Sequence, residues 1–235
     1  MKNQIHPTAI VHESAQLGTD NYIGPFCLIG PNVRIGNGNR FEAYVSIGTA
    51  AEHRDYFHEE PGPVIMGDGN VLREQCTVNG GSNGVTQMGS EIIMLKGAHV
   101  GHDAIVRNRA TLSSFTVLSG HTIIGEGANL GLHTVVHQYR SVGAFAMVGM
   151  NSSITRDLPP FAVSFGSPAR HHRVNRVGLE RAGVTSAEIE RFENWYRLYS
   201  DGEVLPPLNH AFSKFLDQYA ADCATYQPKP KNRAA

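Results

Sequence analysis

The chain has 235 residues, 41% hydrophobic and 17% charged, with a formal net charge of −1 at pH 7, which predicts a soluble globular protein without general attraction for nucleic acid or anionic membranes. Its three cysteines are far apart and form no CxxC pair, so neither a disulfide framework nor a zinc site is expected and a reducing cytoplasm is the default location. The first residues lack a signal-peptide run, and no stretch of about 20 apolar residues occurs, which predicts no integral membrane segment.

An aliphatic or other apolar residue recurs every six positions almost from the start of the chain. Eight such positions run from Ile5 to Ile47, and twelve more run without interruption from Met88 to Ile154. A helix repeats near 3.6 residues and an ordinary strand near 2, so neither explains this period. A hexapeptide repeat does explain it, and predicts a mainly β fold, a parallel β-helix whose aliphatic column points into the core. We expect this β-helix to span residues 1–160.

Two segments interrupt the repeat. The first, at about 50–65, is charged, aromatic and contains proline, and the second, at 80–87, is rich in glycine. We expect both to be loops that leave the β-helix. Long loops on a rigid scaffold often carry function, although solvated decoration is the alternative reading of each.

The repeat stops after Ile154, and we expect residues 161–235 to form a helical region with a disordered tail. Thr185 to Glu188 has the sequence of a capping box, and apolar residues follow it at helical spacing. A second helix is predicted at about 209–221. Because a β-helix leaves unpaired strand edges at its ends, a C-terminal α-helical cap is the simplest role for this region. A contribution to substrate binding is compatible with that role.

The repeat also predicts which residues are neighbours. If three six-residue units close one triangular turn, residues 18 apart stack at one strand spacing, roughly 4.8 Å. Stacking then gathers one outward-facing patch of polar residues and one glycine: His102, Asp103, Gly120, His121, Gln138 and Tyr139, with His137 at its edge and His99 at the neighbouring corner.

This patch suggests proton transfer. His102 is a natural general base near neutral pH, and Asp103 could orient it if the turn bends there, since adjacent strand residues point to opposite faces. Gly120 leaves room above His102 and exposes a backbone N–H that could stabilise an oxyanion. The alternatives are ordinary surface histidines and a metal site, for which no third ligand is compelling.

Several segments together point to one family. IGPFCLIGP, MGDGN, LREQCTV, AHVGHD, VVHQY, DLPPF and VNRVGLERAG occur in this order. With them the chain resembles the UDP-N-acetylglucosamine acyltransferases of lipid A biosynthesis over nearly its whole length. The resemblance implies a left-handed parallel β-helix and a homotrimer with active sites between subunits. It also implies transfer of a 3-hydroxyacyl group from an acyl carrier protein thioester to a sugar hydroxyl, without a bound cofactor or metal. Coenzyme A is the alternative donor.

The resemblance also assigns roles to residues. It implies that His102 is the general base, that Asp103 is its neighbour and that the Gly120 N–H is the oxyanion donor. Met150 occupies the position that limits the acyl groove when bulky, so a short or medium acyl chain is expected. The positions expected to contact substrate or the donor's arm are His99, His121, His137, Gln138, Asn175 and Arg181.

The chain departs from the family pattern near the acceptor. Tyr56, with Arg54 nearby, stands where the family has a lysine, Asn79-Gly80-Gly81 replaces an HRG segment, and Val177 replaces an acid. These departures keep open an N-acyltransferase acting on a nucleotide-linked amino sugar. A non-catalytic β-helix scaffold and a zinc-dependent hydratase on a similar fold are the remaining alternatives.

Overall fold

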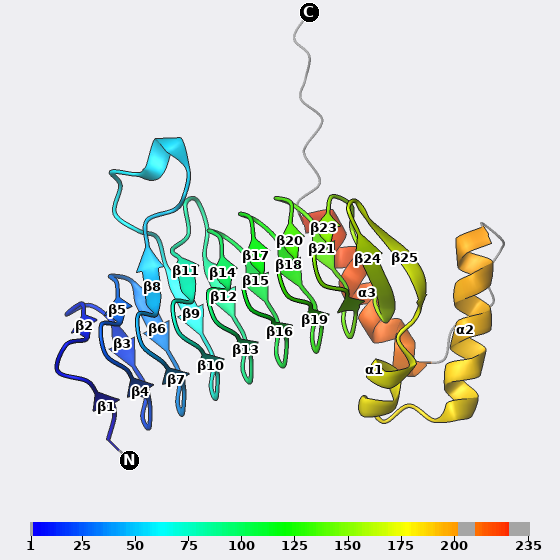
Figure 1. Ribbon diagram of the computed structural model, residues 1–235, viewed down its shortest axis with the longest axis horizontal. Coiled ribbons are helices and arrows are strands. Elements are labelled where there is room, and N and C mark those ends of the chain that lie inside the picture. Colours follow the sequence, from blue (N-terminus) through cyan, green and yellow to red (C-terminus); the bar gives the residue numbers. More distant parts are fainter. Residues whose placement is uncertain (1, 202–209, 226–235) are drawn as a thin grey trace, which may run out of the picture.

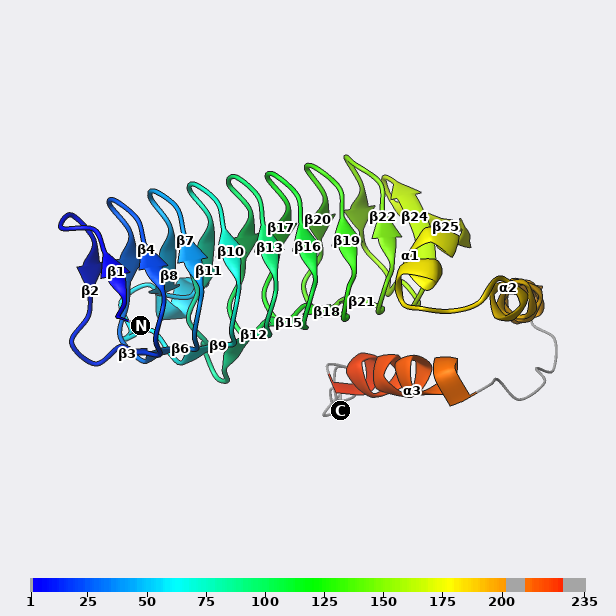
Figure 2. The same cartoon turned by 90° about the horizontal axis from the view of Figure 1, so that it is seen from below.

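The computed structural model describes residues 2–201 and 210–225, and from Gln4 to Ile154 its strands enter three sheets in strict rotation (Figures 1 and 2). The chain therefore winds as a parallel β-helix, as predicted. We name its corners by the sheets that the chain leaves and enters, so the BC corner leads from sheet B to sheet C.

Sheet A has ten strands: β1 (Gln4–Ile5), β4 (Tyr22–Ile23), β7 (Arg40–Phe41), β10 (Val71–Leu72), β13 (Ile93–Met94), β16 (Thr111–Leu112), β19 (Asn129–Leu130), β22 (Met147–Val148), β24 (Ala162–Gly166) and β25 (Ala169–Val174). Sheet B has eight: β2 (Ile10–Val11), β5 (Leu28–Ile29), β8 (Ser46–Thr49), β11 (Thr77–Asn79), β14 (His99–Val100), β17 (Val117–Leu118), β20 (Val135–Val136) and β23 (Ser153–Ile154). Sheet C has seven: β3 (Gln16–Leu17), β6 (Val33–Ile35), β9 (Val64–Met66), β12 (Thr86–Met88), β15 (Ile105–Val106), β18 (Ile123–Ile124) and β21 (Ser141–Val142).

The aliphatic column forms the core. All twelve positions from Met88 to Ile154 are at most 3% exposed. Ile5, in the first coil, is 46% exposed, because it lies at the open N-terminal end of the stack. The uninterrupted regions keep the 18-residue register, for example His99 opposite Val117 in β14 and β17. The period of six therefore fixed both the direction of the side chains and their neighbours.

A ladder of buried asparagines stabilises the corner before sheet A. Asn21, Asn39 and Asn70 are at most 1% exposed. The Asn21 side-chain oxygen accepts from the Asn39 backbone N–H at 2.9 Å, and the Asn39 oxygen accepts from that of Asn70 at 2.8 Å. The Asn70 oxygen then accepts from the Ile92 N–H at 2.8 Å. Each amide thus satisfies a buried backbone donor of the next coil, which burial would otherwise make costly.

Both interruptions of the repeat are loops, and both are shorter than predicted. The first runs from 50 to 63 and contains the 3₁₀ turn η1 (Arg54–Tyr56), and the second runs from 80 to 85. The predicted ranges extended into β9 and β12, which pair with each other from Val64 opposite Thr86 onward. Pairing with a neighbouring coil therefore places in strands some residues that the sequence pattern had assigned to loops.

The C-terminal region was predicted to be helical, but it begins with a β-hairpin. β24 continues sheet A in parallel with β22, and β25 returns antiparallel to β24. The helices are α1 (Arg176–Arg181), α2 (Ser186–Asp201) and α3 (His210–Thr225). The capping box is confirmed, since the Thr185 N–H and hydroxyl donate to the Glu188 carboxylate at 3.0 and 2.6 Å. The predicted disordered tail lies outside the described residues.

The hairpin and the helices share a second apolar cluster that caps the last coil. Phe161 is 1% exposed and its ring lies edge-on to those of Phe192, Phe212 and Phe215, at centroid distances of 5.4–5.8 Å. The predicted capping role is thus confirmed. Within the described residues, no helix is both long enough and apolar enough to cross a bilayer.

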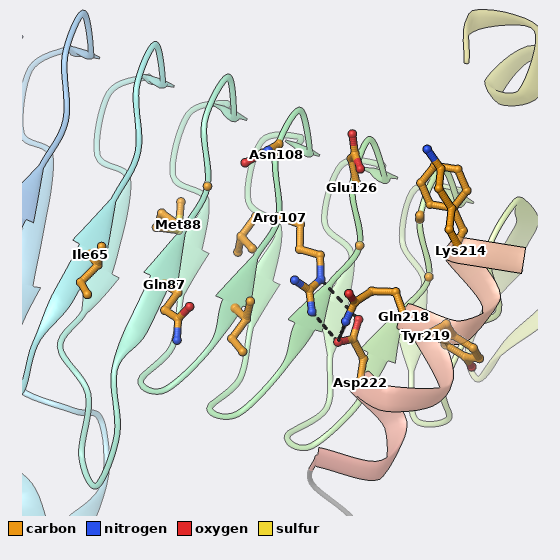
Figure 3. Close-up of a pocket in the computed structure, with 17 residues that line it drawn as sticks. Ile65, Gln87, Met88, Arg107, Asn108, Glu126, Lys214, Gln218, Tyr219 and Asp222 are labelled. Carbon is orange, nitrogen blue, oxygen red and sulfur yellow. Dashed lines mark hydrogen bonds and ion pairs between the residues drawn. The ribbon is translucent and has the colours of Figure 1, made fainter. Parts of the chain in front are cut away.

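Helix α3 runs back alongside the β-helix, against sheet C (Figure 2). The Arg107 guanidinium binds the Asp222 carboxylate of α3 at 2.5 Å, and Gln218 donates to the same carboxylate at 3.0 Å (Figure 3). A cavity of about 460 Å³ lies between α3 and sheet C, lined in part by Gln87 and Tyr219. None of its lining residues belongs to the histidine patch.

Candidate active site

His102 sits in the BC corner directly against Gly120 of the next coil. A Cβ added to Gly120 would lie 2.5 Å from both Cε1 and Nε2 of the His102 ring. The predicted stacking of these two residues is therefore observed, and only glycine leaves space for the imidazole in this position. The Gly120 N–H donates no hydrogen bond to any residue within 2–201 and 210–225.

Asp103 contacts the other ring nitrogen of His102, Nδ1. His102 Nδ1 lies 2.8 Å from Asp103 Oδ2, although the two residues are adjacent in sequence. Asp103 has φ of 57°, so the chain turns sharply at this residue instead of continuing as a strand. The bend that the sequence analysis required is present, and it leaves Nε2 as the ring nitrogen that faces Gly120.

The second loop surrounds the Asp103 carboxylate with donors. The Ser82 hydroxyl donates to Oδ2 at 2.6 Å, and the Ser82 N–H lies 3.1 Å from both oxygens. The Gly84 N–H donates to Oδ1 at 2.9 Å. Burial of this carboxyl, which is 4% exposed, would raise its pKa, but the bonds from His102 and Ser82 and the nearby His121 outweigh burial and hold the pKa of Asp103 far below its usual range.

His121 lies in the patch one coil beyond His102. Its ring stacks on Tyr139 at a centroid distance of 4.7 Å and stands edge-on to His102 at 5.1 Å. Burial lowers the pKa of His121, with the neighbouring His102 and His53 acting in the same direction and Asp103 opposing them. Beyond this stack, His137 and Gln138 are exposed, and His137 Nδ1 lies 3.1 Å from the Gln138 backbone oxygen. The patch is therefore open on the side of the later coils.

The first loop reaches the patch from the side of the earlier coils. His99 Nδ1 lies 2.7 Å from the Thr77 hydroxyl, and its Nε2 lies 3.9 Å from the Glu52 carboxylate. Burial lowers the pKa of His99, while Glu52 opposes the change. The His53 ring stands edge-on to His102 at 6.1 Å.

The sequence analysis did not find Ser82, Gly84, Glu52 or His53. All four lie in the two interruptions of the repeat, where the 18-residue register gives no neighbours. The only available signal was the interruption itself, in the middle of an otherwise regular scaffold.

The remaining expected site residues lie on other corners of the same chain. Asn175 caps α1, accepting from the Gly178 N–H at 3.1 Å and donating to the Phe145 backbone oxygen at 2.7 Å. Arg181 lines a cavity of about 310 Å³ beside Phe145, at the CA corner. Met150, in the AB corner between β22 and β23, is 66% exposed. One chain therefore does not bring these three residues to His102.

The patch is equipped for general base catalysis with oxyanion stabilisation. A histidine held by a carboxylate at Nδ1 keeps Nε2 for proton transfer, and a backbone N–H next to it can bind developing negative charge. Ligand atoms of His102, Asp103 and His121 lie within 4.8 Å of one another, a spacing that could also hold a cation. Binding there would compete with the hydrogen bonds from Ser82 and Gly84 to the carboxylate.

Residues 14–49 match the model of bacterial transferase hexapeptide repeats, which places this β-helix in the hexapeptide-repeat transferase class. Residues 157–223 match a second family model, described as UDP-N-acetylglucosamine O-acyltransferase, domain 2. The chain is 36% identical over 223 residues to the acyl-[acyl-carrier-protein]–UDP-N-acetylglucosamine O-acyltransferase of Thiobacillus denitrificans, covering 86% of each chain. It is 32% identical to the enzyme of the same name from Stutzerimonas stutzeri, covering 83% of each. The chain therefore belongs to the UDP-N-acetylglucosamine O-acyltransferase family.

Solved structures agree with this assignment over more than nine tenths of the chain. LpxA from Acinetobacter baumannii superimposes with a TM-score of 0.76 at 27% identity, covering 95% of this chain and 92% of that one. The UDP-N-acetylglucosamine acyltransferase of Francisella novicida gives a TM-score of 0.74 at 29% identity, covering 94% and 88%. The protein is thus an acyltransferase with the family's β-helix and C-terminal region.

Proposed function

We propose that this enzyme transfers a 3-hydroxyacyl group from an acyl carrier protein thioester to a hydroxyl of UDP-N-acetylglucosamine, the first acyl transfer of lipid A biosynthesis. The names of the relatives from Thiobacillus denitrificans and Stutzerimonas stutzeri support both substrates. The observation that carries the chemistry is His102, with Nδ1 2.8 Å from Asp103 and Nε2 against Gly120.

In the proposed mechanism, His102 Nε2 takes the proton of the sugar hydroxyl as its oxygen attacks the thioester carbonyl. The Asp103 carboxylate accepts the Nδ1 proton in a hydrogen bond and stabilises the imidazolium. The Gly120 N–H donates to the oxyanion of the tetrahedral intermediate. When the intermediate collapses, the C–S bond breaks, the thiolate leaves and the imidazolium returns the proton to it.

The proposal includes a homotrimer with active sites between subunits. His102, Arg181 and Met150 occupy the BC, CA and AB corners of one chain, so one substrate could meet all three only between chains. In that arrangement Asn175 and Arg181 hold the nucleotide sugar or the donor's arm, and Met150 limits the acyl groove. The residues proposed to line the substrate near the base are His99, His121, His137 and Gln138.

The proposed location is the cytoplasm, where a carrier-protein donor would be found. All three cysteines are free, and Cys27 and Cys76 are buried, as suits a reducing compartment. Burial raises the pKa of the Cys76 thiol to about 11, so this group would be a poor nucleophile.

N-acylation of a nucleotide-linked amino sugar is the second candidate. It is favoured by the departures in the acceptor region, where Tyr56 and Asn79-Gly80-Gly81 replace the family's lysine and HRG segment. The base, the carboxylate and the oxyanion donor would act in the same way on an amine.

A substrate panel tests the proposal. Purified enzyme is incubated with UDP-N-acetylglucosamine or its amino-sugar analogues and with 3-hydroxyacyl groups on acyl carrier protein or coenzyme A, and product masses are measured. We expect an acylated UDP-N-acetylglucosamine whose acyl group is released by mild alkali, as for an ester. An alkali-resistant product formed only from an amino sugar would favour the second candidate, and no acyl transfer to any sugar would overturn both.

A further inference from the structure

In the part of the chain that the structure describes, Ser82 hydrogen-bonds to the reaction centre only through Asp103. Its hydroxyl donates to Asp103 Oδ2 at 2.6 Å, and this is the same oxygen that lies 2.8 Å from His102 Nδ1. Its backbone N–H lies 3.1 Å from each carboxylate oxygen. Three polar contacts from one residue thus fix the rotation of the carboxylate.

The loop that carries Ser82 is itself fixed by the first loop. The Gly62 N–H donates to the Gly81 backbone oxygen at 3.0 Å, and the Gly81 N–H donates to the Pro63 backbone oxygen at 3.3 Å. A Cβ on Gly84 would lie 3.1 Å from Asp103 Oδ1, so a glycine there lets the backbone approach the carboxylate closely. The two interruptions of the repeat therefore interlock beneath the base.

A second imidazole competes for the same carboxylate. His121 Nε2 lies 3.6 Å from Asp103 Oδ2. His121 belongs to the coil that follows Asp103 in the β-helix, whereas the Ser82 loop belongs to the coil that precedes it. A small rotation of an unsupported carboxylate would exchange its short contact with His102 for one with His121. The donors of Ser82 hold the oxygen where it favours His102.

We propose that Ser82 is a positioning residue for acyl transfer, which commits the Asp103 carboxylate to His102 in preference to His121 and so holds Nε2 over Gly120. This inference rests on the proposed function, in which His102 is the base. It assigns to Ser82 and Gly84 of the second loop the task of supplying the donors that orient the Asp103 carboxylate beside the base.

The test compares Ser82→Ala and Ser82→Thr with Ser90→Ala as the matched control. The Ser90 hydroxyl accepts from the Asp68 N–H at 3.0 Å at another corner, so its loss removes a similar bond away from the site. We expect Ser82→Ala to lower kcat about 10- to 100-fold, with KM changed less than about twofold, because misplacement of a catalytic group acts on the transition state. Ser82→Thr keeps the hydroxyl and should restore most of the rate.

A double substitution separates positioning from a merely structural role. In an Asp103→Asn background, Ser82→Ala should cost almost nothing further in kcat, because the carboxylate that Ser82 positions is already gone. A structural role for Ser82 would lower kcat in either background.

Wild-type kcat in Ser82→Ala would overturn the inference, as would the full loss of rate in the Asp103→Asn background. The proposed function would survive either result as long as wild-type enzyme acylates the sugar, so the two failures are distinguishable. If Ser82→Ala does not fold, Ser82→Cys keeps the size of the side chain but is a weak donor, and it carries the same expectations and the same overturning result.

Discussion

Substitution of Gly120 by alanine isolates the contact on which the site depends. The new Cβ would lie 2.5 Å from Cε1 and Nε2 of His102, whereas unstrained carbon contacts need about 3.5 Å, so the ring must move by about 1 Å. The obstacle is the end of a flexible side chain, so the β-helix itself should persist. Displacing a catalytic group by this distance costs about 100-fold in rate, equivalent to about 2.7 kcal/mol of transition-state stabilisation.

The assay measures initial rates of acyl transfer and urea unfolding on the same preparations. Gly38→Ala is the control, because its Cβ would meet no atom within 4 Å but its φ of 65° disfavours a side chain. We expect Gly120→Ala to lose about 100-fold in kcat with an unfolding midpoint close to that of wild type. Gly38→Ala should be less stable and fully active. Wild-type kcat in a folded Gly120→Ala enzyme would refute the reasoning.

Four further outcomes are expected. Asn39→Ala removes the acceptor for the buried Asn70 N–H and should lower the free energy of unfolding by about 1–3 kcal/mol in urea titrations; an unchanged midpoint would contradict the role of the ladder. Arg107→Met deprives the Asp222 carboxylate of its cation and should cost about 2 kcal/mol and speed amide exchange in α3; unchanged exchange would show that the pair does not hold the helix. Burial lowers the pKa of His99 below 6.5, so the unfolded chain binds a proton at a pH where the folded chain does not, and the free energy of unfolding should fall as the pH drops below 6.5. The fall should be smaller in His99→Gln; an equal change of the urea midpoint between pH 7.5 and 5.5 in both proteins would oppose this. Met150→Gly should shift donor preference toward longer acyl chains in a competition of graded thioesters; a wild-type enzyme that prefers the longest donor would refute the expectation.

The core and half of the site followed from the sequence because one backbone period controls both. Once residues 18 apart stack, the inward aliphatic column and the contact of His102 with Gly120 need no further information. The bond between His102 and Asp103 was less certain from the strand rule, because it depends on a left-handed turn at Asp103.

The other half of the site came from segments without a period. Ser82 reaches the Asp103 carboxylate and His53 reaches the His102 ring because their loops fold back onto the BC corner, and no repeat relates their sequence positions to that corner. The β24–β25 hairpin was missed for a similar reason, since its pairing follows from the exposed edge of the last coil more than from its own residues. Regular spacing predicts neighbours, whereas loops must satisfy partners that only the folded chain supplies.

The central claim is that His102 is the base of acyl transfer, and its most direct test is kcat/KM against pH for wild type and His102→Gln. The account predicts an acid limb in the wild-type profile and, in the folded variant, a rate roughly a thousandfold lower without that limb. A His102→Gln enzyme that acylates the sugar at close to the wild-type rate, with the same pH profile, would contradict it.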